Sequence, residues 1–274
     1  MNFENKTIII TGAASGIGRG LALEAVLRGA SVALLDIDSD GLSETLSLVN
    51  DINGSQTHST SMLDVSSLDS WRSVRNKILD DHQTVDGIIN NAGITYSGTV
   101  EDTEYQNFEN VMAVNFMGTL YGTREFLPLL KQRPEAFIAN VSSVFGLYPM
   151  KKQAAYCASK YAVAGFTGVL AQELKSSSIT VSSIHPGHIA TRVLRNAVEA
   201  GNTAGVTLPK AHQDYILDAF EATGLPASKA AKTILDGIQK KRRKILVGKD
   251  AEQADWRSRL LPKRFIDRMN AQAL

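Results

Sequence analysis

The sequence predicts an α/β fold, in which helices cover both faces of a mainly parallel sheet and a helical extension follows at the C-terminus. Short apolar runs, many rich in β-branched residues, recur along the chain, as expected for strands that are buried on both faces. Segments with helical periodicity separate them, which is the pattern of repeated β-α-β units. The strand-like runs are residues 7–10, 31–35, 57–63 (the weakest), 85–89, 136–141, 180–185 and 245–247. The helices are expected at residues 17–28, 41–50, 68–79, 105–130 and 227–239.

Length and composition fit one globular domain over residues 1–274. Of the 274 residues 43% are hydrophobic and 21% charged, so the chain can bury a large core. Its net charge of +1 gives no field that would attract nucleic acid. Cys157 is the only cysteine, which excludes an intrachain disulfide and a cysteine-based metal cluster. We expect Cys157 to be packed in a helix and expect no metal site.

No part of the sequence has the character of a membrane span. No uninterrupted apolar run approaches the ~18 residues that cross a bilayer. Residues 1–6 run directly into the first strand without the layout of a signal peptide. We therefore expect a cytoplasmic protein with no integral membrane span.

A glycine-rich loop, TGAASGIG at residues 11–18, joins the first strand to the first helix. Glycines let the backbone approach a pyrophosphate, and the N-terminus of the following helix offers unpaired N–H groups and partial positive charge. The loop therefore indicates a phosphate site. The alternative is a glycine-rich turn that only joins strand to helix.

Asp36 ends the second strand, about twenty residues after the glycine loop, where dinucleotide-binding folds often carry an acidic residue. A carboxylate there can accept hydrogen bonds from both hydroxyls of an adenosine ribose and repels a 2′-phosphate. This favours NAD as the cofactor, with NADP the less favoured alternative. A carboxylate that only caps the next helix is the other interpretation. Arg19 is the nearest cation, and we expect it on the helix surface.

The segment AYCASK at residues 155–160 places Tyr156 and Lys160 four residues apart, and so on one face of a helix. A free tyrosine titrates near ~10, so acid–base work at neutral pH requires stabilisation of its anion, which a lysine ammonium can supply. In isolation such a pair is usually a packed ring beside a solvated charge. Whether this pair is catalytic depends on the motifs that accompany it in the sequence.

Together, TGxxxGxG at residues 11–18, NNAG at 90–93, Ser143 and YxxxK at 156–160 resemble the short-chain dehydrogenase/reductase family. The resemblance extends from about residue 6 to residue 191, with the motifs in the family's order. It implies a three-layer, doubly wound Rossmann-type sheet. It also implies an enzyme that moves hydride between a nicotinamide and an oxygen-bearing carbon of a small-molecule alcohol or ketone, and a homotetramer or homodimer.

The resemblance implies four catalytic residues. Tyr156 is expected to be the acid–base group, and Ser143, thirteen residues before it, to bind the same substrate oxygen. Lys160 is expected to lower the pKa of the phenol and to bind the nicotinamide ribose. Asn115 is expected to bend its helix so that a backbone carbonyl can hold a water near the lysine. A core asparagine with only a structural hydrogen bond is the alternative.

The resemblance also implies contacts with the cofactor along the chain. Asp64 and Val65 are expected at the adenine, although a short acidic turn is the alternative, and Ile189 and Thr191 at the carboxamide. The NNAG segment is expected to be mainly architectural. The full predicted set is Gly12, Ser15, Gly16, Ile17, Gly18, Asp36, Asp64, Val65, Asn91, Ala92, Gly93, Tyr156, Lys160, Pro186, Gly187, Ile189 and Thr191.

Residues 190–226 are the least family-like, and we expect a partly helical, mobile lid that determines the substrate. We expect His188, just before it, to line the pocket or lie exposed in a loop. Apolar residues beyond Ser143 are expected to form the pocket walls, which favours a hydrophobic, alicyclic or steroid-like substrate. These residues are Leu147, Tyr148, Pro149 and Met150, and the lid, with its apolar cluster Tyr215, Ile216, Leu217 and Phe220, is expected to contribute to the walls as well.

Two further segments carry clusters of cations. The run KKRRK at residues 240–244 is expected to be solvated surface, with nucleic acid or an anionic membrane as the alternative. Residues 250–272 are expected to form a tail helix whose apolar stripe docks on its own core or on another subunit. A membrane-interface helix is the alternative for that tail.

Overall fold

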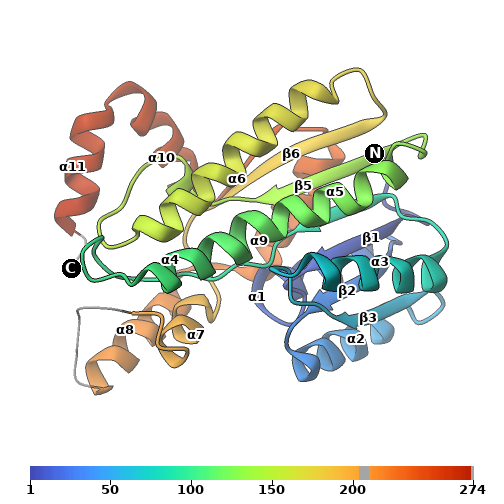
Figure 1. Ribbon diagram of the computed structural model, residues 1–274, viewed down its shortest axis with the longest axis horizontal. Helices are drawn as coiled ribbons and strands as arrows, with labels where there is room; N and C mark the ends of the chain where they lie inside the picture. Colours follow the sequence, from blue (N-terminus) through green and yellow to red (C-terminus); the bar gives the residue numbers. More distant parts are fainter. Residues whose placement is uncertain (204–209, 273–274) are drawn as a thin grey trace.

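Figure 1 shows the computed structural model, which describes residues 1–203 and 210–272. The predicted sheet is confirmed: seven strands lie in the order β3-β2-β1-β4-β5-β6-β9, and all pairs are parallel. The order reverses between β1 and β4, so the chain leaves these strands in opposite directions and a crevice opens at their carboxyl ends. The strands are β1 (Thr7–Thr11), β2 (Ser31–Asp36), β3 (His58–Met62), β4 (Gly87–Asn90), β5 (Ala136–Val141), β6 (Ile179–Pro186) and β9 (Lys244–Val247).

Helices cover both faces of the sheet, which confirms the three-layer arrangement (Figure 1). On one face, apolar side chains of α1, α2 and α9 pack against the strands in a single buried cluster. On the other face, α3, α5 and α6 contribute to a second cluster. Their bounds are α1 (Gly16–Leu27), α2 (Ser39–Asn53), α3 (Leu68–His82), α5 (Gly118–Leu130), α6 (Ala154–Glu173) and α9 (Ala227–Gln239).

The segment predicted as one helix over residues 105–130 is divided into three parts. α4 (Tyr105–Met112) is followed by a π-helical turn, η1 (Ala113–Met117), and then by α5. A π-turn inserts an extra residue into the helical ladder, and such turns occur frequently at functional sites. Asn115 is the buried residue of this turn.

The predicted lid contains two helices, α7 (Val193–Glu199) and α8 (Lys210–Thr223), while residues 204–209 lie outside the described part of the chain. A short parallel pair, β7 (Ile189–Ala190) with β8 (Leu225–Pro226), closes its base. Arg195 on α7 binds Asp218 at 2.7 Å and Glu221 at 2.9 Å on α8. These ion pairs hold the two lid helices together.

The C-terminal tail is two helices, not the single helix expected over residues 250–272. α10 (Lys249–Leu260) is followed by Leu261, whose backbone is not helical, and α11 (Pro262–Gln272) then begins at a proline. The break follows from Pro262, because proline starts a helix readily but cannot continue one. Phe265 of α11 is buried against Tyr148, with ring centroids 4.9 Å apart, so the tail docks on its own chain.

The run of cations at residues 240–244 lies at the surface between α9 and β9. Lys241 binds Glu135 at 2.7 Å, and Lys244 forms an ion pair with Asp255. In the described ranges, no helix is both long and apolar enough to cross a bilayer.

Candidate active site

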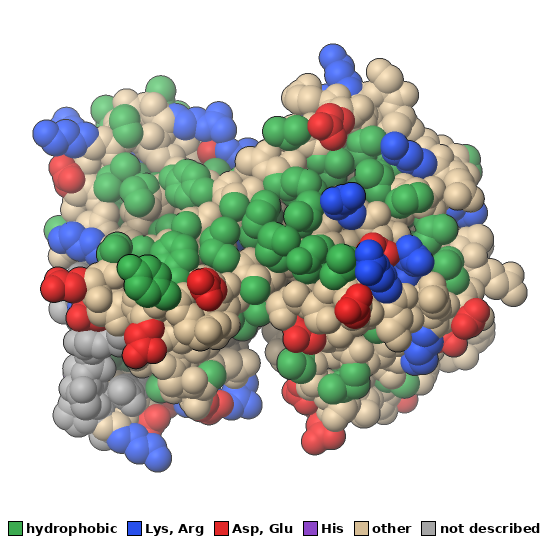
Figure 2. Space-filling model, viewed as in Figure 1, with side chains coloured by type: hydrophobic (Ala, Val, Ile, Leu, Met, Phe, Trp, Pro, Cys, Tyr) green, Lys and Arg blue, Asp and Glu red, His purple; other side chains and the backbone are tan. Residues whose placement is uncertain are grey.

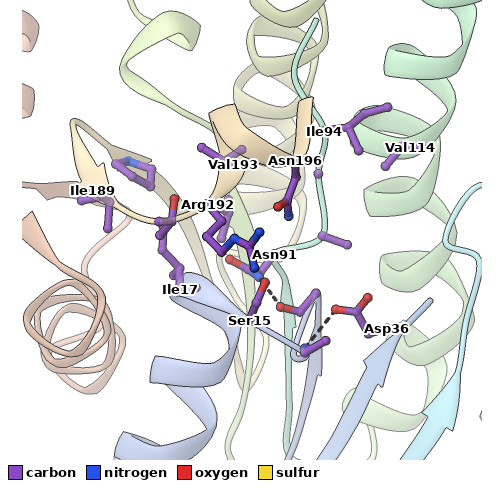
Figure 3. Close-up of a pocket in the computed structure, with 18 of the residues that line it drawn as sticks. Ser15, Ile17, Asp36, Asn91, Ile94, Val114, Ile189, Arg192, Val193 and Asn196 are labelled. Carbon is purple, nitrogen blue, oxygen red and sulfur yellow. Dashed lines mark hydrogen bonds between the residues drawn. The ribbon is translucent and has the colours of Figure 1, made fainter. Parts of the chain in front are cut away.

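A cavity of ≈ 490 Å³ lies at the carboxyl ends of the strands, in the crevice beside β1 and β4. The glycine loop, the end of β2, the NNAG segment, the start of α6 and the loop after β6 all contribute to its walls (Figure 3). All predicted cofactor residues line it except Gly18, and of the four predicted catalytic residues only Asn115 lies outside its lining.

The glycine loop has the form that a pyrophosphate requires. Gly12 and Gly16 have φ of +66° and +54°, a backbone conformation that disfavours other residues. A Cβ on Gly18 would lie 1.9 Å from the Gly12 carbonyl oxygen, so this position must stay bare for helix and loop to pack. Ser15 precedes α1 but makes no capping bond with its side chain. The first N–H groups of α1 therefore remain available to an anion.

Asp36, the last residue of β2, lines the cavity at one end (Figure 3). One carboxylate oxygen accepts the Ala14 N–H at 3.0 Å, and the other accepts the Ile37 and Asp38 N–H groups at 2.7 and 3.1 Å. These bonds fix the carboxylate in place, and the oxygen that binds Ala14 retains capacity to accept from a hydroxyl.

Arg19 is held at the junction of α1 and α2 and is less exposed than expected. Its guanidinium donates to the Ala14 carbonyl at 2.6 Å, to Glu44 at 2.6 Å and to the hydroxyl of Thr45 at 3.0 Å. Glu44 thus forms an ion pair with Arg19 at the mouth of this junction.

The NNAG segment joins the ends of β1 and β4. The Thr11 hydroxyl accepts the N–H groups of Asn91 and Ala92, both at 2.9 Å, and the Asn91 side chain donates to the Thr11 carbonyl at 2.9 Å. A Cβ on Gly93 would lie 3.1 Å from Asn115 Oδ1 and 3.2 Å from Lys160 Nζ. Gly93 thus leaves room for the polar groups behind the cavity.

Tyr156 and Lys160 both project from the first turns of α6, and Lys160 is almost fully buried. The Lys160 Nζ donates to the Val141 carbonyl at 3.0 Å and lies 5.6 Å from the centroid of the Tyr156 ring. Burial lowers the pKa of Lys160 to about 8. The ammonium is therefore still the main form at neutral pH, although the site disfavours it.

The pKa of Tyr156 is raised in this structure, which differs from the lowered value expected for the phenol. Burial is the largest cause, and the Ser143 hydroxyl, as a hydrogen-bond partner, lowers the pKa by less. The Lys160 ammonium is engaged with the Val141 carbonyl. The resting phenol is accordingly neutral at neutral pH.

Ser143 follows β5 and caps the short 3-10 helix η2 (Val144–Gly146). Its Oγ accepts the Phe145 N–H at 3.2 Å, so the hydrogen of the hydroxyl is free to point elsewhere. The neighbouring Ser142 donates to the Lys160 carbonyl at 2.7 Å, which ties β5 to α6. Ser142 thus links two elements of the fold, whereas the hydroxyl hydrogen of Ser143 is not used by this cap.

Asn115 is fully engaged inside the π-turn. Its Oδ1 accepts the Ile94 N–H at 2.8 Å, and its Nδ2 donates to the Ile94 carbonyl and to the Ser159 hydroxyl, both at 2.9 Å. The Asn115 backbone carbonyl accepts the Thr119 hydroxyl at 2.8 Å. These contacts join η1 to α6 and to the segment after β4.

The part of the cavity away from Asp36 is formed partly by the expected lid, including Phe220 of its apolar cluster, and partly by residues that the sequence did not mark. Ile94, Val114, Val193, Asn196 and Phe220 line it, and Figure 3 shows Val193 and Asn196 on the opposite side from Ser15 and Asp36. The lining residues on α7 and α8 come from the segment least similar to the family, so no motif marks them.

The four residues expected as pocket walls do not line the cavity. Leu147, Tyr148 and Met150 instead pack with Phe265 of α11, and Pro149 is exposed. Their apolar side chains are covered by the C-terminal helices, whose position the local sequence does not reveal.

His188 contacts the lid. Its Nε2 forms a hydrogen bond with the Phe220 carbonyl at 2.8 Å, and the two rings lie 4.0 Å apart. It therefore links the loop after β6 to α8. No described segment brings together three His, Cys, Asp or Glu side chains that could hold a metal ion.

Comparison with known proteins places this geometry in a family. The family model for short chain dehydrogenases matches residues 6–202. The putative oxidoreductase SadH of Mycobacterium tuberculosis is 37% identical over 262 residues, which cover 95% of this chain and 92% of the relative. Dehydrogenase/reductase SDR family member 7B of Mus musculus is 31% identical over 246 residues, covering 89% and 73%.

Comparison with solved structures gives the same family. A short-chain dehydrogenase/reductase from Burkholderia phymatum in complex with NAD superposes with a TM-score of 0.85 at 26% identity, covering 100% of this chain and 99% of the other. Levodione reductase, at 24% identity and a TM-score of 0.80, shares the fold over 92% of this chain and 98% of its own. The chain therefore belongs to the short-chain dehydrogenase/reductase family and is an NAD(P)-dependent oxidoreductase.

Proposed function

We propose that this protein interconverts a secondary alcohol and a ketone on a hydrophobic substrate, with NAD as its preferred cofactor. One observation supports this most directly: Ser143, Tyr156 and Lys160 line the same cavity as the glycine loop and Asp36. A hydroxyl, a phenol and an ammonium can thus act on a substrate oxygen beside a dinucleotide. When bound, the nicotinamide supplies or accepts the hydride.

Tyr156 is the proton donor in the reducing direction. Because burial raises the pKa of Tyr156, the phenol carries its proton at neutral pH and can give it to the developing alkoxide. Lys160, with its ammonium near the ring, stabilises the phenolate that remains. In the oxidising direction the phenolate takes the alcohol proton.

Ser143 and Asn115 support this transfer. The Ser143 Oγ already accepts a backbone N–H, so its own hydrogen can be donated to the substrate oxygen and polarise the carbonyl. Lys160 also holds the nicotinamide ribose. Asn115 maintains the π-turn, so that a backbone carbonyl can keep a relay water near Lys160.

The preference for NAD follows from the charges at the adenosine end. Asp36 and Asp38 both line the cavity there, and the guanidinium of Arg19 is bound to Glu44. A 2′-phosphate would meet two carboxylates with no free cation from Arg19. A ribose with two hydroxyls would instead find an acceptor in Asp36.

The lining of the substrate end favours an apolar, alicyclic or steroid-like skeleton. Ile94, Val114, Val193 and Phe220 contribute apolar surface, and Asn196 contributes a polar group. Four apolar side chains facing one amide suit a ligand with one polar substituent besides the reacting oxygen.

A homodimer or homotetramer suits the exposed surface of α6. Figure 2 shows apolar side chains gathered along the face that α5 and α6 form in Figure 1. Tyr161 and Val169 of α6 are 43% and 59% exposed. Burial of such residues against a second subunit would be favourable.

Cofactor titration followed by turnover tests the proposal. NADH and NADPH binding would be measured by fluorescence, and apolar secondary alcohols and ketones would then be screened by reduced-nicotinamide absorbance. We expect tighter binding of NADH and turnover that Tyr156→Phe abolishes without loss of NADH binding. Preference for NADPH would refute the cofactor assignment, and binding without any turnover would indicate a nucleotide-sensing protein.

A further inference from the structure

His185 lies next to the catalytic cavity without lining it. It is the penultimate residue of β6, directly before Pro186, and is 2% exposed. Its Nδ1 is 3.0 Å from the Ser143 carbonyl oxygen, and its Nε2 is 2.9 Å from the Ser183 hydroxyl. Both nitrogens of this buried imidazole therefore form hydrogen bonds, and one of these bonds is to the backbone of Ser143, the proposed catalytic serine.

The partners determine which nitrogen carries the proton. A carbonyl oxygen can only accept, so Nδ1 must donate to Ser143. In the neutral ring Nε2 is then the acceptor, and the Ser183 hydroxyl donates to it. The chain Ser183–His185–Ser143 therefore has one direction of donation throughout: the Ser143 carbonyl fixes the tautomer, and the Ser183 hydroxyl satisfies Nε2 on the other side of the ring.

The surroundings keep this ring neutral. Burial is the largest influence and lowers the pKa of His185 to about 4. Lys244 and Arg259 lower it further, whereas Asp255 and the bond to Ser143 act in the opposite direction. At physiological pH the ring is therefore a fixed donor to Ser143 that does not titrate.

The bond from His185 to the Ser143 carbonyl helps to fix the position of the Ser143 backbone. Among the bonds that hold the chain where it leaves the sheet, the Ser142 N–H donates to the Ile184 carbonyl at 2.8 Å, the Gly146 N–H donates to the Ser143 carbonyl at 3.0 Å, and the Phe145 N–H donates to Ser143 Oγ. The His185 ring is the one side chain in the described structure that donates to the Ser143 carbonyl.

We propose that His185 is a positioning residue, which holds the Ser143 backbone from β6 so that the Ser143 hydroxyl points at the reacting oxygen. The inference rests on the proposed function, in which Ser143 binds that oxygen. It also explains a histidine within an apolar strand end, where a core position would otherwise hold an aliphatic side chain.

Two substitutions, each of which replaces one nitrogen of the ring by an amide nitrogen, distinguish a positioning role of His185 from a packing role. In His185→Asn the amide nitrogen can occupy the place of Nδ1 and keep the bond to Ser143. In His185→Gln the longer side chain carries its amide to the place of Nε2, so it can bond to Ser183 but leaves the Ser143 carbonyl without this donor. Both variants remove the ring, so any loss of packing is similar in the two.

The expected result is a split between them. His185→Asn should keep a kcat close to that of the wild type, and His185→Gln should lower kcat about ten- to a hundredfold, as misplacement of a catalytic group by ~1 Å does. The Kd of NADH and the KM should change little in both. Equal kcat values for the two variants, whether both high or both low, would overturn the proposal.

Neighbouring serines of β6 give a matched control. Ser182→Ala removes a buried hydrogen bond to the Arg242 carbonyl at 2.7 Å, and should lower the Tm without changing kcat. Ser183→Ala removes the hydroxyl that holds the ring through Nε2, and should lower kcat by less than His185→Gln does. A kcat that falls equally in both variants would show a general effect of strand packing and refute the assignment.

Crystal structures of the two His185 variants provide a readout that needs no turnover. The Ser143 Oγ should be displaced in His185→Gln and remain in place in His185→Asn. If the wild type reduces no substrate but this displacement is found, the proposed function fails and the positioning role stands. If Ser143 is unmoved in both, the positioning role fails whatever the activity.

Discussion

Replacing Lys160 by methionine is expected to stabilise the protein while abolishing turnover. Lys160 is 3% exposed, and burial lowers its pKa from 10.5 to about 8. Each pKa unit corresponds to about 1.4 kcal/mol, so the folded state disfavours the ammonium by about 3 kcal/mol relative to the unfolded chain. Methionine fills a similar volume without a charge.

Part of this gain is offset by the contact that the ammonium makes. Lys160 Nζ donates to the Val141 carbonyl at 3.0 Å, and an unpaired buried carbonyl costs about 1–3 kcal/mol. We therefore expect a net gain of up to about 2 kcal/mol at pH 7. For a chain of this size that corresponds to a rise in Tm of several degrees.

The dependence on pH identifies the cause. Below pH 8 the lysine is protonated in both folded and unfolded states, so the full penalty is present. Between about 8 and 10.5 the unfolded state binds more protons, and the stability of the wild type rises with pH relative to the variant. The advantage of Lys160→Met should therefore shrink over this range.

Thermal and urea unfolding of the cofactor-free protein from pH 7 to 10.5 measures the effect. Lys6→Met is the matched control, because Lys6 binds the buried Asp86 at 3.3 Å and its loss should destabilise the protein. A Lys160→Met variant that is less stable than the wild type at pH 7, with a gap independent of pH, would refute the reasoning.

Three other changes test separate parts of the site. Asp36→Ala should reduce the preference for NADH over NADPH by about tenfold or more, measured as a ratio of Kd values, because it removes a negative charge facing the 2′ position. An unchanged ratio would contradict the role of Asp36. Gly18→Ala should abolish NADH binding or lower the Tm, since the new Cβ would lie 1.9 Å from the Gly12 carbonyl oxygen. Asn115→Leu should lower the Tm by several degrees, because it leaves the Ile94 backbone groups and the Ser159 hydroxyl without partners; an unaltered Tm would show that these bonds are dispensable.

The parts of the site that the sequence predicts are those whose requirements are local. Gly12 and Gly16 need left-handed backbone, and Tyr156 and Lys160 need only one turn of helix between them. The strand order then brings the ends of β1, β2, β4, β5 and β6 to one edge, so motifs far apart in sequence meet there. Local backbone requirements and the strand order are together enough to predict where these residues lie.

Residues that depend on contacts between distant segments were not predicted. The Lys151 N–H donates to Asn270, 119 positions along the chain, and α11 covers the segment expected to line the pocket. The π-turn at Asn115 results from bonds to Ile94 and Ser159, neither of which is adjacent in sequence. Periodicity over 105–130 indicates a helix but not this insertion.

The electrostatics of the Tyr156–Lys160 pair follow from burial and not from spacing. Spacing alone suggests that the ammonium lowers the pKa of the phenol. In the structure, burial disfavours the charged form of each group separately, raising the pKa of Tyr156 and lowering that of Lys160. The same low dielectric strengthens attraction between opposite charges. In the mechanism we propose, proton transfer from Tyr156 to a substrate leaves a phenolate beside an ammonium that was poorly solvated beforehand, so the pair gains most when the reaction creates the second charge. A site that makes Lys160 unstable in the resting enzyme thereby favours the transition state over the ground state.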